Sequence, residues 1–102
     1  MYEINVLEFK NVKLNLLSRK LFVSDIEIGL RNKEFSLLEY FLNNIGRVVS
    51  RTQLLEEVWD RNICCSTNTV DVHISKLRKK ITDQTNKCFI RTVHCIGYIC
   101  DV

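Results

Sequence analysis

The sequence contains no proline and only three glycines among its 102 residues. Stretches rich in these two residues are typical of linkers, and none divides this chain, which is long enough for one compact domain and too short for two. The few glycines also form no glycine-rich loop of the kind that binds nucleotide phosphates. We therefore expect a single domain over residues 1–102 that uses no cofactor.

Long apolar segments are missing as well. No run approaches the roughly 18 to 20 apolar residues that span a bilayer, and the chain begins Met-Tyr-Glu, acidic where a signal peptide is basic. Apolar residues make up 46% of the chain and charged residues 26%, the balance of an ordinary globular domain rather than a disordered segment. We expect a cytoplasmic protein without a membrane partner.

The five cysteines lack the spacing of a structural zinc site, because no C-x-x-C pair is present. Their odd number leaves at least one thiol unpaired. We expect no bound metal, and we expect Cys88, Cys95 and Cys100 to act as small apolar side chains in a reduced compartment. A redox or zinc sensor at Cys64 and Cys65 is an alternative that the sequence leaves open.

Catalytic machinery also finds little support in the sequence. The two histidines, His73 and His94, stand in no recognisable arrangement with an activated nucleophile. We therefore expect a binding protein and not an enzyme.

What the chain does have is an uneven distribution of charge. Residues 1–60 carry 8 basic and 9 acidic groups, whereas residues 61–102 carry 7 basic and 3 acidic groups. A basic second half indicates a surface for a polyanion, and nucleic acid is the commonest such partner.

The first thirty residues show the alternation of half-buried strands. Apolar residues occupy every second position in segments 4–6, 12–16 and 26–30. Polar turn signals separate these segments at Lys10-Asn11, at residues 18–20 and at Ser24-Asp25. The pattern predicts a small antiparallel sheet.

From residue 32 the period becomes helical. A first helix carries an apolar stripe and is expected to end at Gly46. A second begins at Ser50, where Gln53 completes a capping box, and a polar segment, residues 60–66, separates it from a third over residues 67–81. The first stripe consists of Phe35, Leu38, Phe41, Leu42 and Ile45, and the third helix buries Val70, Ile74, Leu77 and Ile81.

Segments 88–93 and 98–102 are β-rich and are joined through residues 94–97, which predicts a closing hairpin. The expected fold class is therefore α+β, with an N-terminal sheet, three helices and a hairpin: a helix-turn-helix followed by a β-wing.

The third helix has a polar side opposite its apolar stripe. Short hydrogen-bonding groups are followed there by cations, a chemistry that fits base edges and phosphates of the DNA major groove. A solvated helix face is the alternative, and Asp71 near the helix start also suits the helix dipole. The polar side comprises Asn68, Val72, Ser75, Lys76 and Lys79, flanked by Thr69, His73 and Lys80.

Four segments in this order resemble the OmpR/PhoB-type effector domain, the DNA-binding output domain of bacterial response regulators. They are residues 30–38 (LRNKEFSLL), 48–59 (VVSRTQLLEEVW), 69–80 (TVDVHISKLRKK) and 92–98 (TVHCIGY). The resemblance implies a winged helix with a four-stranded N-terminal antiparallel sheet. It places the third helix in the major groove and the hairpin at the adjacent minor groove.

Together, the resemblance and the helix pattern suggest specific residues. We expect Asn68, Asp71, Val72, Ser75 and Lys76 to read bases. We expect contacts to the DNA backbone from Arg51, Trp59, Thr69, His73, Arg78, Lys79, Thr92 and Tyr98, wing contacts from Arg91 and His94, and an RNA polymerase contact loop that includes Asp60, Arg61, Asn62 and Ile63.

The resemblance also implies partners. We expect head-to-tail pairing on direct DNA repeats, a monomer away from DNA, and control by a sensor kinase through a receiver domain outside these residues. The competing hypothesis is a winged helix that docks on polymerase or another regulator through residues 60–66 without reading DNA.

Two departures from the family pattern bear on the site. Arg31-Asn32 stands where the family has threonine and proline, so Asn32 is expected to cap the first helix. His94 and Cys95 stand where the hairpin usually carries arginine and glycine. We expect weaker or pH-sensitive wing binding, or reliance on Arg91 or Lys87.

Overall fold

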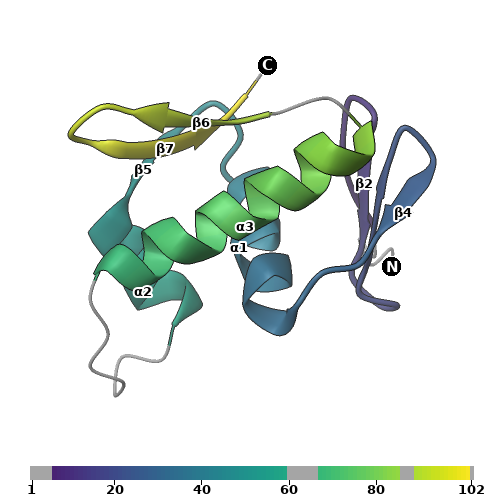
Figure 1. The fold of residues 1–102 in the computed structure, drawn as a ribbon, viewed down its shortest axis with the longest axis horizontal. Helices are drawn as coiled ribbons and strands as arrows, with labels where there is room; N and C mark the ends of the chain where they lie inside the picture. Colours follow the sequence, from purple (N-terminus) through teal and green to yellow (C-terminus); the bar gives the residue numbers. More distant parts are fainter. Residues whose placement is uncertain (1–5, 60–66, 86–88, 102) are drawn as a thin grey trace, which may run out of the picture.

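The computed structural model describes residues 6–59, 67–85 and 89–101. A four-stranded sheet comes first, followed by three helices and a second, three-stranded sheet that contains the C-terminal hairpin. The third helix, α3 (Thr67–Thr85), crosses the molecule between the two sheets (Figure 1). The α+β class and the order of sheet, helices and hairpin are as the sequence predicts.

The N-terminal sheet is an antiparallel meander in the order β1-β2-β3-β4. Turn residues with positive φ, among them Lys10 and Arg19, lie at the predicted turns. Alternation pointed to only three strands, and β3 was missed because three apolar residues in a row, Leu21 to Val23, hide its alternation; Leu21 and Val23 are buried and Phe22 is half-buried. The strands are β1 (Val6–Phe9), β2 (Val12–Asn15), β3 (Lys20–Val23) and β4 (Ile26–Ile28).

The first helix, α1 (Asn32–Leu42), differs from the prediction at both ends. Its N-cap is Arg31 and not Asn32, because Glu34 accepts a hydrogen bond of 2.8 Å from the Arg31 amide. It ends at Leu42, well before Gly46. Gly46 has φ 81° and donates its amide to the Cys100 carbonyl oxygen at 3.0 Å, so it shapes the connection to the next strand.

A short strand that the sequence did not indicate, β5 (Val48–Ser50), precedes the second helix, α2 (Arg51–Val58). The Ser50 hydroxyl accepts from the Gln53 amide at 3.0 Å, as predicted. The other half of the expected capping box is wrong, because the Gln53 side chain donates to the Tyr40 hydroxyl at 2.6 Å.

The third helix continues four residues beyond the predicted end at residue 81. Neither glycine nor proline interrupts it, and residues 82–84 are exposed, so their polar side chains stay in contact with water. The Thr85 hydroxyl donates to the Ile81 carbonyl oxygen at 2.7 Å. The predicted stripe is confirmed: Val70, Ile74, Leu77 and Ile81 are buried.

The hairpin consists of β6 (Ile90–Val93) and β7 (Gly97–Cys100), joined by a turn in which Cys95 has φ 64°. The strand β7 lies between β6 and β5. Gly97 makes this pairing possible, since a Cβ atom there would lie 2.0 Å from the Val49 carbonyl oxygen. The hairpin is thus fixed to the segment that leads directly into α2.

The cysteine prediction is half right. Cys100 is completely buried, and burial raises the pKa of its thiol to about 12, which makes it unreactive. Cys95 is exposed at the hairpin turn, so it is not a core residue. Cys64, Cys65 and Cys88 lie outside the described residues.

Candidate nucleic-acid interface

The exposed side of α3 is polar and uninterrupted by other elements. Lys76 and Lys79 follow shorter polar groups along it, and Val72 is 50% exposed among them. The five predicted residues Asn68, Val72, Ser75, Lys76 and Lys79 are all exposed, whereas Thr69, His73 and Lys80 are half-buried at its margins.

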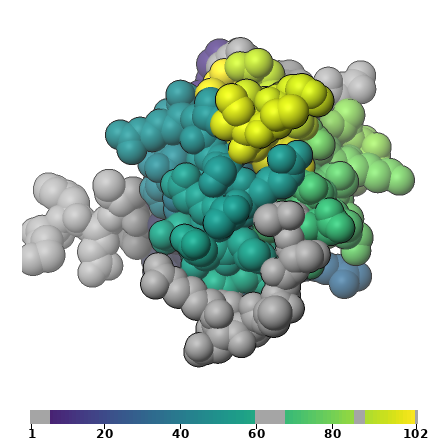
Figure 2. Space-filling model, turned by 90° about the vertical axis from the view of Figure 1, so that its left-hand side faces the viewer, coloured from purple at the N-terminus to yellow at the C-terminus, as the bar shows by residue number. Residues whose placement is uncertain are grey.

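A hydrogen-bonded cluster, which we call the hairpin flank, occupies the side of α3 that faces the hairpin. Its central atom is Oδ1 of Asp71, which accepts from Arg51 Nε at 2.8 Å and from the Tyr98 hydroxyl at 2.5 Å. The flank joins α2, α3 and the hairpin, which meet on one face of the molecule (Figure 2). It comprises Arg51, Asp71, Arg78, Thr92 and Tyr98.

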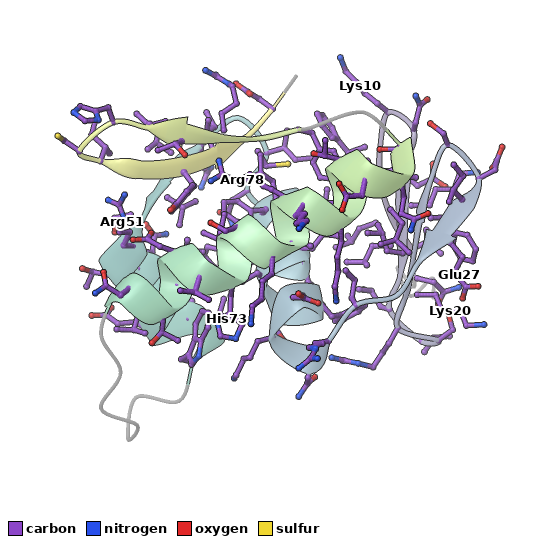
Figure 3. All side chains as sticks on the ribbon, in the orientation of Figure 1. Lys10, Lys20, Glu27, Arg51, His73 and Arg78 are labelled. Atoms are coloured by element: carbon purple, nitrogen blue, oxygen red, sulfur yellow. The ribbon has the colours of Figure 1, made fainter. Side chains whose placement is uncertain are left out.

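The aromatic ring of Tyr98 adds a second set of contacts to the hairpin flank. The guanidinium carbons of Arg51 and Arg78 lie 5.4 Å and 5.5 Å from the ring centroid, within range of cation–π attraction. Arg78 also donates to the Thr92 hydroxyl at 3.0 Å. Both arginines therefore lie on the hairpin side of α3, whereas His73 lies on the other side (Figure 3).

The hairpin flank keeps its ionisable groups in fixed charge states. Burial acts to raise the pKa of Asp71, but the hydrogen bonds from Tyr98 and Arg51 and the charges of Arg51 and Arg78 outweigh it and lower the pKa. Burial and the Asp71 carboxylate raise the pKa of Tyr98, and the same carboxylate raises the pKa of Arg51. At neutral pH the carboxylate is therefore ionised and the phenol is protonated.

On the opposite side of α3, side chains from α1, α3 and the end of α2 form a second group, which we call the α1 flank. It comprises Lys33, Trp59 and His73. The rings of Trp59 and His73 meet edge to face, 5.1 Å apart. Lys33 of α1 donates to the Val58 carbonyl oxygen at 3.1 Å and lies 5.6 Å from the Trp59 ring centroid. Sequence reasoning missed Lys33, because nothing in the α1 pattern distinguishes it from other surface lysines.

His73 has a defined hydrogen-bonding pattern. Its Nδ1 lies 2.8 Å from the Thr69 carbonyl oxygen. A carbonyl oxygen only accepts, so Nδ1 carries the proton and Nε2 of the neutral ring is an acceptor. Donation from Nε2 to a phosphate therefore requires the protonated ring.

Several predicted residues are less accessible than the sequence suggested. Trp59 and Tyr98 are only 7% and 3% exposed. Arg91 makes two hydrogen bonds, of 2.7 Å and 2.6 Å, to Asp101, a partner that the sequence pattern did not reveal. His94 and Thr92 are exposed. Asp60, Arg61, Asn62, Ile63 and Lys87 lie outside the described residues.

Neither a metal site nor a membrane-spanning helix emerges from the part of the chain that the structure describes. Within residues 6–59, 67–85 and 89–101, no three His, Cys, Asp or Glu side chains come together as metal ligands. No helix in the same ranges is long and apolar enough to cross a bilayer.

Comparison with known proteins identifies this architecture. The family model described as the C-terminal domain of transcriptional regulatory proteins matches residues 25–100. The chain belongs to this family. From here on we call it the OmpR/PhoB-type domain. Its general function is DNA binding in transcription regulation.

Relatives and solved structures agree with this assignment. The transcriptional regulatory protein CusR of Escherichia coli K12 is 39% identical over 92 residues, which cover 90% of this chain and 40% of CusR. The Thermotoga maritima OmpR/PhoB homologue DrrB is 30% identical with a TM-score of 0.81, over 96% of this chain and 45% of DrrB. The DNA-binding domain of the response regulator AdeR, solved in complex with an intercistronic region, is 26% identical with a TM-score of 0.84, over 92% of this chain and 97% of that domain.

The OmpR/PhoB-type domain therefore spans less than half the length of the curated relative that it matches. CusR, DrrB and AdeR are described as regulators, and none of these three descriptions is of an enzyme.

Proposed function

We propose that this domain binds double-stranded DNA sequence-specifically, with α3 in the major groove. The observation that carries the proposal is the exposed polar side of α3, which is bordered on both flanks by cations. An α-helix fits the major groove, about 12 Å wide, where short polar groups pair with base edges and an apolar group contacts a thymine methyl. The proposed base-reading residues are Asn68, Val72, Ser75 and Lys76.

The two flanks supply contacts to the phosphodiester backbone. On the hairpin flank, Arg51, Arg78 and the exposed Thr92 are the proposed donors. Because Asp71 already accepts from Arg51 and Tyr98, we propose that it orients these groups instead of reading a base. The remaining proposed contacts to the DNA backbone are Trp59, Thr69, His73 and Lys79. Tyr98 acts mainly by positioning the arginines of the hairpin flank.

The hairpin turn is the proposed contact with the minor groove. Its exposed side chains are His94, Cys95 and Ile96. Arg91 is held by Asp101, so its contribution depends on exchanging that carboxylate for a phosphate. We therefore expect a weak wing contact carried by His94.

The whole protein is proposed to be a cytoplasmic response regulator of a two-component system. CusR is longer than this domain, which leaves room for a receiver domain controlled by a sensor kinase. We further propose that the domain is monomeric in solution, pairs head to tail on direct repeats, and contacts RNA polymerase through residues 60–63.

Selection of bound duplexes from a genomic fragment library tests the function. Wild type should enrich a repeated motif, and binding should weaken as salt rises, because counterions released from phosphates drive association. Lys76→Ala should relax selection at one base position. Lys13→Ala is the control, since Lys13 is exposed on β2, whose buried neighbours Val12 and Leu14 face the core.

The outcomes separate the competing hypotheses. Absence of enrichment, with weak binding that ignores sequence, would contradict the proposal and favour the protein-docking winged helix. Activity that changes on oxidation only while Cys64 and Cys65 are intact would favour a thiol sensor instead.

A further inference from the structure

A basic groove lies between the exposed side of α3 and the start of α1. It has a volume of about 300 Å³ and is open to solvent. The start of α1 lies on the side of α3 away from the hairpin (Figure 1). The groove is lined by Arg31, Glu34, Lys76, Lys79, Lys80 and Asp83.

One acidic group of the groove is already neutralised within the protein. Glu34 is 1% exposed, and its Oε1 accepts from Lys80 Nζ at 2.5 Å and from the Arg31 amide at 2.8 Å. This contact fixes the start of α1 against α3. The Arg31 side chain itself is exposed, and its charge adds to the lowering of the Glu34 pKa.

The remaining charges of the groove favour an anion. Arg31, Lys76 and Lys79 are exposed, and within the described ranges no ion pair involves any of them. Asp83 is the single opposing carboxylate among the lining residues that Lys80 does not neutralise. A neighbouring cation, Arg19, donates to Asn32 Oδ1 at 2.6 Å and adds to the positive potential at the start of α1.

The groove is continuous with the proposed DNA-binding side of α3, because Lys76 and Lys79 belong to both. A helix in the major groove lies between two phosphodiester strands. If the strand beside the hairpin is bound by the hairpin flank, the other strand passes on the side of α1. The groove presents its cations to that second strand.

We propose that Arg31, with Lys79, binds the phosphodiester backbone of the DNA strand on the α1 side. This inference rests on the proposed DNA binding and adds Arg31, since none of the predicted DNA contacts lies at the start of α1. The hairpin offers little compensation, since among residues 89–101 its only arginine, Arg91, is paired with Asp101. The α1 side therefore carries a larger share of the electrostatic affinity than the hairpin turn.

The decisive variant is Arg31→Thr. Threonine is a good N-cap, so the helix keeps its start while losing the cation. We expect the slope of log affinity against log salt concentration to become shallower by about 0.9. The matched control is Lys13→Thr on the outer side of β2, which should leave the slope unchanged.

The measurement uses a random-sequence duplex, so it does not require the operator to be known. Lys79→Gln should reduce the slope by a similar amount, and the double variant by about twice as much. Arg31→Gln removes the same cation without introducing a threonine N-cap, so it separates the loss of charge from any effect of the new cap. Thermal unfolding followed by circular dichroism verifies that every variant is folded.

Two results distinguish this inference from the proposed function. If Arg51→Ala makes the slope shallower but folded Arg31→Thr and Arg31→Gln do not, the α1 contact is wrong while DNA binding stands. If wild type shows no salt-dependent binding to any duplex, both are overturned. Phosphate ethylation that interferes with wild type but not with Arg31→Thr, at a phosphate on the α1 side, would place the contact.

Discussion

The hairpin flank and the groove beside α1 both carry positive charge, but their cations have different partners. On the hairpin flank, Arg51 and Arg78 are fixed by a carboxylate, a hydroxyl and an aromatic ring. In the groove beside α1, the cations of Arg31, Lys76 and Lys79 have no ion-pair partner among the described residues. Guanidinium groups held by hydrogen bonds favour defined geometry, whereas cations without an ion-pair partner mainly neutralise phosphates. We infer that the hairpin flank sets the orientation of α3 and that the α1 side adds affinity.

Two carboxylates, Asp71 and Glu34, explain why the cations of the two regions have different partners. Asp71 is half-buried on the proposed DNA-binding side and pairs with Arg51, so its charge serves the proposed interface. Glu34 is buried beneath the groove and pairs with Lys80, so its charge serves the packing of α1 on α3. A similar acid–base pair therefore organises a binding surface on one flank and a helix contact on the other.

Gly97→Ala should break the hairpin flank most severely. The new Cβ would lie 2.0 Å from the Val49 carbonyl oxygen and 2.8 Å from the Ser50 Cα, so β7 must move away from β5. We expect a loss of about 3 kcal/mol in the free energy of unfolding, measured by urea denaturation. Gly29→Ala is the control, because nothing lies within 4 Å of its added Cβ; equal stability of the two variants would contradict the close approach.

Lys80→Met tests the contact between α1 and α3 that the Lys80–Glu34 ion pair makes beneath the groove. It leaves Glu34 buried without its cation, which should cost about 2 kcal/mol at neutral pH. Lys79→Met, one residue away and exposed, should cost little. In wild type burial acts to raise the pKa of Glu34, but the hydrogen bonds from Lys80 and the Arg31 amide and the charges of Lys80 and Arg31 outweigh it and lower the pKa. Stability from this lowered pKa is present above about pH 4 and is lost on acidification, so the deficit of Lys80→Met should shrink as the pH falls.

Asp71→Asn sharpens the assignment of the hairpin flank. The amide keeps the shape of the carboxylate but loses the ion pair with Arg51, and because the site is partly exposed we expect a cost of about 1 kcal/mol. The lowered pKa of Asp71 stabilises the folded state above about pH 4, so this difference should disappear on acidification. In duplex selection, the motif should be unchanged and bound more weakly. A change of the preferred base at one position would instead show that Asp71 reads that base.

His73→Gln should give the smallest effect. Since Nδ1 donates to the Thr69 carbonyl oxygen, Nε2 of the neutral ring has no proton to donate to a phosphate. We expect His73→Gln to lower the affinity for duplex DNA by less than Arg51→Ala does, as measured by fluorescence anisotropy at one fixed salt concentration. His94→Gln on the exposed hairpin turn is the comparison. A loss of affinity in His73→Gln as large as that in Arg51→Ala would contradict the minor role of His73.

The sequence predicted those features that depend on one element at a time. Helical spacing placed Val70, Ile74, Leu77 and Ile81 in the core and the polar side of α3 in solvent, and Ser50 was correctly identified as the cap of α2. These features were accessible because periodicity and capping are local properties of the chain.

What the sequence missed depends on elements that meet only in the folded molecule. Three residues, Val48 to Ser50, form a strand because β7 pairs with them, and Arg31 caps α1 because Glu34 is held in place. The contact between Asp71, Arg51 and Tyr98 spans 20 and 27 residues of sequence. By itself the sequence determined the order of sheet, helices and hairpin and which side of α3 faces outward, because these follow from the periodicity of apolar residues and from local turn signals. Only the tertiary structure decided which charged side chains on that side are paired and which have no ion-pair partner among the described residues, because ion pairing depends on distances between atoms that the chain brings together from separate elements.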